Sequence, residues 1–201
     1  MTNMDFNDLV EKVSQYVTQF LKEKLSPKLY FHNILHTNYV VNAVKEIGFQ
    51  SGLTPQEMEN VILAAWFHDT GYTEVYKDHE LVSIEIATQF LAGLGIVNEK
   101  IADIRSCILA TRYPQKPENL MEMVVCDADF YHFSSDRYPD FADALKREWE
   151  ETIGLTYTQK QWDNINWEML SFHHYFTPYA QATLQLKKEE NIKKLVQNLQ
   201  L

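Results

Sequence analysis

A histidine and an aspartate stand side by side directly after an apolar run. His68 and Asp69 follow residues 62–67 (ILAAWF), and Gly71 comes two positions later. At the last turn of a helix, adjacent His and Asp side chains can point to one place beyond the helix end. A neutral imidazole and a carboxylate together suit a divalent transition metal ion or Mn²⁺. The alternative is an exposed pair at a helix end, but a charged carboxylate beside a buried apolar run needs a partner.

A second candidate ligand is His36, on the core-facing side of a helix predicted over residues 33–49 and four residues after His32. Histidines spaced i and i+4 share a helix face and can approach one ion. A lone histidine on such a face is more often a hydrogen-bonded core residue. The metal hypothesis therefore depends on His36 meeting the His68-Asp69 pair in the folded chain.

Two carboxylates, Asp127 and Asp129, follow the apolar run 123–126 (MVVC). On a helix, side chains two residues apart point about 200° away from each other, so the two acids cannot serve one site equally. One is expected to be a ligand and the other a helix-end or surface acid. Residue types alone leave both assignments open.

Helices must position these candidates. Apolar residues recur with helical spacing over residues 5–24 and 33–49. A third helix is indicated by Thr54-Pro55-Gln56-Glu57, which supplies an N-cap, a proline at the first helical position and a capping-box glutamate. Gly71 is interpreted as a helix stop. Further helices are predicted over 79–93, 98–112, 118–133, 138–152, 159–174 (where Thr158 and Gln161 form a second capping box) and 188–199.

No alternation of Val and Ile indicates a sheet, so the expected fold class is all-α with about eight or nine helices. The 201 residues fit one domain, since domains commonly hold about 100–200 residues. The chain carries 18 basic and 28 acidic residues, a net charge of −10. A nucleic-acid polymer is an unsuitable partner for such a surface, because phosphate backbones need clustered Lys and Arg. A small anionic substrate remains compatible with it.

Compartment is indicated by the cysteines and the first residues. Cys107 and Cys126 have no paired spacing and are expected to be free thiols in a reducing compartment. Residues 1–20 mix charged with apolar residues, unlike a signal peptide or a membrane span. The cytoplasm is therefore the expected location.

The ordered set of His36, His68-Asp69 and a later Asp resembles the HD superfamily of metal-dependent phosphohydrolases. Residues 31–37 (FHNILHT) resemble its aromatic-His-Asn…His-Thr segment, and residues 66–72 (WFHDTGY) resemble its helix ending in His-Asp-x-Gly-Tyr. His79-Glu80 with Ser83 resembles a His-Glu-x-x-Ser element, and 109–112 (LATR) an Ala-Thr-Lys element. The resemblance covers roughly residues 30–135. It implies an HD-type helical bundle with an N-terminal helix and a C-terminal helical extension, all within one domain of residues 1–201.

The resemblance also implies the metal ligands. They would be His36, His68, Asp69 and one of the two later acids, with Asp129 favoured because it lies between an Ala and an apolar residue. Asp127 stays as the alternative. HD proteins with two metals add further histidines, and none stands near residues 111–113. One divalent ion is therefore expected, with Mn, Mg, Co, Ni, Fe and Zn as candidates.

By the same resemblance, the chain would hydrolyse a small phosphoester or phosphoanhydride, a nucleotide among them, with a metal-activated water. Asp69 would be catalytic as well as a ligand, and His79 and Glu80 would act as acid, base or orienting groups. Substrate contacts would come from His32, Lys77 and Arg112. Arg112 stands where relatives often carry Lys, and its guanidinium suits phosphate oxygens.

Two other function classes compete. One is a non-catalytic module that binds a nucleotide and regulates a partner, and the other, less favoured, is a di-iron oxygenase of the HD type. In the C-terminal third, the aromatic cluster at residues 172–179 is interpreted as a helix end packed on the core, with a lid that stacks on a base as the alternative. The helix predicted over 188–199 would pack on the core or on a second copy in a homodimer.

Overall fold

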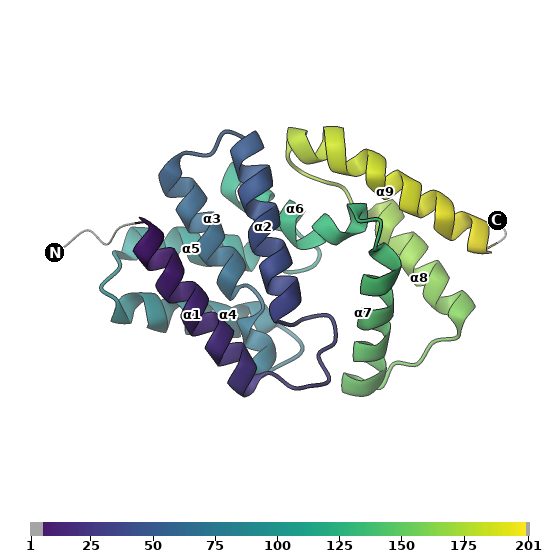
Figure 1. The fold of residues 1–201 in the computed structure, drawn as a ribbon, viewed down its shortest axis with the longest axis horizontal. Coiled ribbons are helices and arrows are strands. Elements are labelled where there is room, and N and C mark those ends of the chain that lie inside the picture. The colour runs from purple at the N-terminus through teal and green to yellow at the C-terminus, as the bar shows by residue number, and fades with distance from the viewer. Residues whose placement is uncertain (1–5, 200–201) are drawn as a thin grey trace.

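Helices build all of the chain that the structure describes. The computed structural model describes residues 6–199, in which nine α-helices and two short 3₁₀ helices occur without any strand (Figure 1). The all-α prediction is confirmed. The elements are α1 (Phe6–Lys24), α2 (Ile34–Gln50), α3 (Pro55–Phe67), η1 (Thr70–Thr73), α4 (His79–Gly93), α5 (Asn98–Ala110), α6 (Leu120–Asp129), η2 (Phe130–Ser134), α7 (Tyr138–Thr152), α8 (Gln159–Phe172) and α9 (Pro178–Leu199).

The central helix is α3, which contacts α1, α2, α5 and α6. Its residues from Val61 to Phe67 are all buried. A helical segment that is apolar on every side is stable only inside a core, and here helices α1 to α6 supply that core together with Ala180 and Leu184 of α9. Helices α7, α8 and α9 form the other end of the molecule (Figure 1). A smaller apolar cluster of Phe133, Tyr138, Ala142 and Leu170 lies there. No described helix has the length and apolar content that crossing a bilayer requires.

Caps fix where the helices start. The predicted capping boxes are confirmed: Thr54 with Glu57 begins α3, and Thr158 with Gln161 begins α8. In α2, the Asn33 side chain accepts hydrogen bonds from the amides of Leu35 and His36. Because such a cap satisfies amide groups that the first turn leaves free, it sets the helix start and places His36 in the first turn of α2.

Two predicted helix boundaries were wrong. The last helix begins at Pro178, ten residues before the predicted start at 188. Thr177 accepts a hydrogen bond from the Ala180 amide, so a threonine cap followed by proline starts α9 as it starts α3. The helix predicted over 118–133 ends at Asp129 and continues as the 3₁₀ turn η2. This tighter winding turns the chain directly after Asp129.

Gly71 has a different role from the predicted helix stop. Helix α3 ends at Phe67, and Gly71 lies in η1 without a left-handed backbone. Its constraint is close packing, since a Cβ at Gly71 would lie 2.0 Å from the carbonyl oxygen of His79 and 2.9 Å from the amide of Ser83. The Ser83 hydroxyl accepts from the Gly71 amide and donates to the His68 carbonyl. Glycine therefore lets α4 approach the end of α3.

We predict that Gly71→Ala lowers the free energy of unfolding by about 2–3 kcal/mol, because α4 must move to admit the methyl group. Gly93→Ala, at the end of α4, is the matched control: no atom lies within 4 Å of the added Cβ. There the change should stay within about 1 kcal/mol. Urea unfolding of both variants measures the difference, and equal stabilities would contradict close packing at Gly71.

Candidate metal centre

Three side chains predicted to bind metal meet at one point. His36 comes from the first turn of α2, and His68 and Asp69 follow the end of α3. The two Nε2 atoms lie 3.4 Å apart, and Asp69 Oδ2 lies 3.4 Å from His36 Nε2 and 3.2 Å from His68 Nε2. All three residues are buried. Their ligand atoms are close enough to share one ion.

Asp129, the last residue of α6, brings a fourth donor atom. Its Oδ1 lies 3.4 Å from His36 Nε2 and 3.7 Å from His68 Nε2. Its other oxygen accepts from the Gln115 side chain at 3.3 Å. The four residues His36, His68, Asp69 and Asp129 are called the metal cluster below.

Asp127 lies elsewhere. Its side chain is fully buried, and its two oxygens accept from the backbone amides of Phe176 at 2.7 Å and Thr177 at 2.8 Å. Burial raises the pKa of Asp127 to about 6, although the two amide donors act in the opposite direction. The structure thus separates the two acids: Asp129 faces the histidines, and Asp127 holds the chain at the start of α9.

The donor atoms of the metal cluster are suited to a cation. His68 Nδ1 lies 2.8 Å from the carbonyl oxygen of Ala65, which can only accept, so Nδ1 carries a proton and Nε2 of the neutral ring presents a lone pair. The buried oxygen Asp69 Oδ2 has no hydrogen-bond partner. Buried polar atoms are almost always satisfied. A divalent ion bound by two imidazole nitrogens and two carboxylates would satisfy these atoms together.

Electrostatics within the metal cluster favour a shared proton when no metal is bound. Burial lowers the pKa of His68, but the nearby carboxylates of Asp69 and Asp129 outweigh it and raise this pKa to about 9. Burial raises the pKa of Asp69, but His68 and His79 outweigh it and hold this pKa well below its ordinary value. A metal must therefore displace a proton.

His79 and Glu80 lie in the first turn of α4, beside the metal cluster. His79 Nε2 is 3.4 Å from Asp69 Oδ1 and 3.7 Å from Glu80 Oε1. The His79 ring stacks on Tyr72 with 3.8 Å between ring centroids. Glu80 is buried, and its Oε2 has no hydrogen-bond partner. The structure thus places His79 against Asp69 Oδ1, and it places Glu80 against His79.

His32 is held by the protein at both ring nitrogens. Its Nδ1 lies 2.5 Å from Glu148 Oε1, and its Nε2 lies 3.2 Å from the Tyr72 hydroxyl. The fully buried Glu148, from α7, also accepts from the backbone amides of Phe31 and His32 and from the Tyr76 hydroxyl. Glu148 is not predictable from the sequence, because one acid among several in an amphipathic helix carries no signal of burial.

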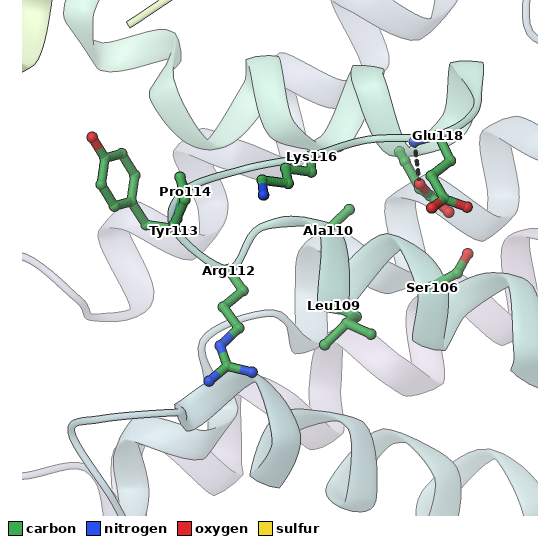
Figure 2. A pocket seen from close by; sticks show the side chains of 9 residues that line it. Ser106, Leu109, Ala110, Arg112, Tyr113, Pro114, Lys116 and Glu118 are labelled. Carbon is green, nitrogen blue, oxygen red and sulfur yellow. Dashed lines mark hydrogen bonds between the residues drawn. The ribbon is translucent and has the colours of Figure 1, made fainter. Parts of the chain in front are cut away.

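The two cations predicted to hold phosphate are not brought to the metal cluster. Lys77 is exposed, and Arg112 forms an ion pair with Asp78. Arg112 lines a groove of about 660 Å³ together with Lys116 and Tyr113, and Tyr113 also lines a cleft beside the metal cluster. Figure 2 shows this groove, with the Arg112 side chain extending away from the loop that carries Lys116. The local reason is Asp78, which neutralises Arg112 at the surface.

A cleft of about 400 Å³ opens beside the metal cluster, with Asp129 and His32 in its wall. His132, another wall residue that sequence analysis missed, lies three residues after Asp129 in the turn η2. Its Nδ1 is 3.0 Å from the Asp129 carbonyl oxygen, and burial lowers its pKa to about 3. The ring is therefore neutral, and it supports the backbone of a predicted ligand.

Comparison with solved structures identifies the architecture. The chain is similar to the crystal structure of a predicted HD superfamily hydrolase from an uncultured Thermotogales bacterium, with a TM-score of 0.64 and 18% sequence identity. The match covers 97% of both chains. The chain has the HD fold. Comparisons with protein-family models and with curated proteins give no match. The likeness of fold extends over nearly the whole chain, so it takes in α7 to α9 as well as the helices that carry the metal cluster.

Exchanging either acid for alanine should separate the two roles. Asp127→Ala leaves two buried amides unpaired and should lower the free energy of unfolding by about 2–4 kcal/mol, with metal affinity little changed. Asp129→Ala should weaken Mn²⁺ binding by more than the roughly 10–100-fold typical of outer-shell partners. Urea unfolding and metal titration measure the two effects. Loss of metal binding in the Asp127 variant alone would reverse the assignment.

Metal binding at pH 7.5 should release about one proton, because His68 of the metal-free protein stays protonated up to a pKa of about 9. Between pH 6.5 and 8.5 the affinity should rise about tenfold per pH unit. The same raised pKa means that the metal-free protein loses stability as the pH rises from 6.5 through about 9. Calorimetry in two buffers of different ionisation enthalpy counts the protons, and heats independent of the buffer would contradict this.

Proposed function

We propose that this HD-fold protein is a metal-dependent phosphohydrolase that acts on a small phosphoester or phosphoanhydride. The observation that carries the proposal is the convergence of two imidazole nitrogens and two carboxylates on one point, with Asp69 Oδ2 buried and without a hydrogen bond. The likeness of fold to a predicted HD superfamily hydrolase supports the same class of reaction. Fold alone does not define chemistry, so the donor set is the main support.

The metal cluster would hold one divalent ion. Its mixed nitrogen and oxygen donors suit Mn²⁺, Fe²⁺, Co²⁺, Ni²⁺ and Zn²⁺, and its two carboxylates also admit Mg²⁺. When bound, such an ion supplies Lewis-acid activation of the phosphoryl group and of the attacking water. The protein's part is to fix the donors. The Ala65 carbonyl orients His68, and Gln115 orients Asp129.

Proton transfer would fall to Asp69, His79 and Glu80. Hydrolysis needs a base to take a proton from the attacking water and an acid to return one to the leaving oxygen. Asp69 Oδ1 and His79 Nε2, 3.4 Å apart, form a pair that can hold a proton at the edge of the metal cluster. Glu80 Oε1 lies 3.7 Å beyond His79 Nε2 and can stabilise the protonated ring. We assign the acid–base work to this chain of groups.

A phosphate-release screen with Mn²⁺, Mg²⁺, Co²⁺ and Ni²⁺ tests the proposal. His68→Ala and Asp69→Ala should lower turnover by at least about 1,000-fold while the helical fold persists, because each removes a ligand of the metal that activates the phosphoryl group. His174→Ala, which truncates an exposed histidine, should leave turnover unchanged. Circular dichroism of all three variants checks the fold.

Two outcomes would contradict the proposal. If His68→Ala retains turnover, the metal cluster is not the active centre. If the metal-loaded protein binds nucleotides but releases neither phosphate nor pyrophosphate from any compound, the regulatory binding module predicted as the alternative is the better description.

A further inference from the structure

The cleft beside the metal cluster has two walls of different origin. One wall comes from the segments that carry or neighbour the ligands, and includes Phe31, Tyr72 and Phe130. The other comes from α7 and α8, and includes Leu145, Trp149 and Met169. Asp129 is part of the lining, so a molecule in this cleft reaches the metal cluster with one end. Helices α7 and α8 therefore contact the part of the substrate to which the phosphoryl group is attached.

The lining is largely aromatic or apolar. Among the described lining residues, Asp129 and three histidines are the only ones that are neither aliphatic nor Phe, Tyr, Trp or Met. Tyr72, Tyr76 and Trp149 offer ring surface, and Trp149 is half-buried. Apolar and planar groups gain free energy when such surfaces take them out of water. The cleft is therefore built for an organic group with few charges.

Positive charge is scarce in this cleft. No lysine or arginine is found among its described lining residues. Arg112 is paired with Asp78 and Lys77 is exposed, and neither is among the lining residues of the cleft. Lys188 of α9 is almost fully buried and donates to the carbonyl oxygen and Nδ1 of His173, so its charge is already engaged. A chain of phosphates would enter a site where His32 is already paired with Glu148 and where Asp129 adds a negative charge.

We propose that the substrate is a phosphate monoester whose organic part is planar or apolar, and that polyphosphate chains are excluded. The inference rests on the proposed function, because the metal cluster is what receives the single phosphoryl group. Each further phosphate would have to leave water without a counter-charge, and burying an unpaired charge is costly. A planar or apolar organic group avoids this cost, because it gains free energy from contact with the aromatic rings and with α7 and α8.

Leu145 is the position at which this selection can be changed. It lies on α7, lines the cleft, is only half-buried and belongs to neither apolar core. Leu145→Lys removes apolar contact and adds a cation, so it should weaken binding of an apolar group and favour an anionic one. Leu155→Lys makes the same exchange at an exposed leucine beyond α7 and serves as the control.

The kinetic test compares 1-naphthylmethyl phosphate with ethyl phosphate, two alkyl esters with similar leaving alcohols, and with inorganic tripolyphosphate. In the wild-type protein with Mn²⁺, kcat/KM for the naphthylmethyl ester should exceed that for the ethyl ester at least about tenfold. Tripolyphosphate should be the poorest substrate. Leu145→Lys should remove most of the tenfold preference and raise turnover of tripolyphosphate, and Leu155→Lys should change neither.

A binding test separates this inference from the proposed function. Calorimetry measures 1-naphthylmethylphosphonate and ethylphosphonate, which cannot be hydrolysed, on the Mn²⁺-loaded protein and its two variants. Tighter binding of the naphthyl compound, reduced only by Leu145→Lys, supports the inferred selection for an apolar organic group. If such binding occurs but no ester is hydrolysed, the proposed function fails while the inferred selectivity of the cleft stands. Equal affinities for the two phosphonates, preferred turnover of tripolyphosphate, or equal effects of the two variants would overturn the inference.

Discussion

The structure depends on holding electron-rich atoms against one another. Nε2 of His36 and of His68 face oxygens of Asp69 and Asp129 at 3.2–3.7 Å, and these atoms lie on three different helices. Such an arrangement is stable only if a proton or a cation lies between the groups and if the backbone cannot relax. Rigidity comes from the second half of α3, whose residues Val61 to Phe67 are all buried, and from the Asn33 cap that fixes the start of α2.

The approach of α4 to the end of α3 places a proposed catalytic residue beside the metal cluster. Because Gly71 has no side chain, the first turn of α4 packs against η1, and the Ser83 hydroxyl joins the Gly71 amide to the His68 carbonyl. The same contact brings His79 to Asp69. One packing contact thus orients a predicted ligand and its proposed proton partner together, which links stability of the fold to the geometry of the site.

The sequence predicted what depends on short-range signals. Capping boxes, helical periodicity and the His-Asp pair lie within a few residues, so the helices could be expected from local patterns. The convergence of His36 with His68, 32 residues apart, was expected only from the resemblance to the HD superfamily. Long-range contacts escaped prediction. Glu148 pairs with His32 from 116 residues away, and its burial cannot be inferred from an amphipathic helix. Arg112 was expected at the substrate. Its ion-pair partner, Asp78, is visible only in the folded chain, so nothing in the sequence contradicted that expectation.

Glu148 has a consequence for how far α7 to α9 can be treated as a separate unit. It is supplied by α7, outside the segment that carries the metal ligands, yet it accepts hydrogen bonds from the backbone just before α2. A shortened chain that ended before α7 would leave two amides and one imidazole without their acceptor. The C-terminal helices therefore help to hold the start of α2, and the first six helices lose that support without them.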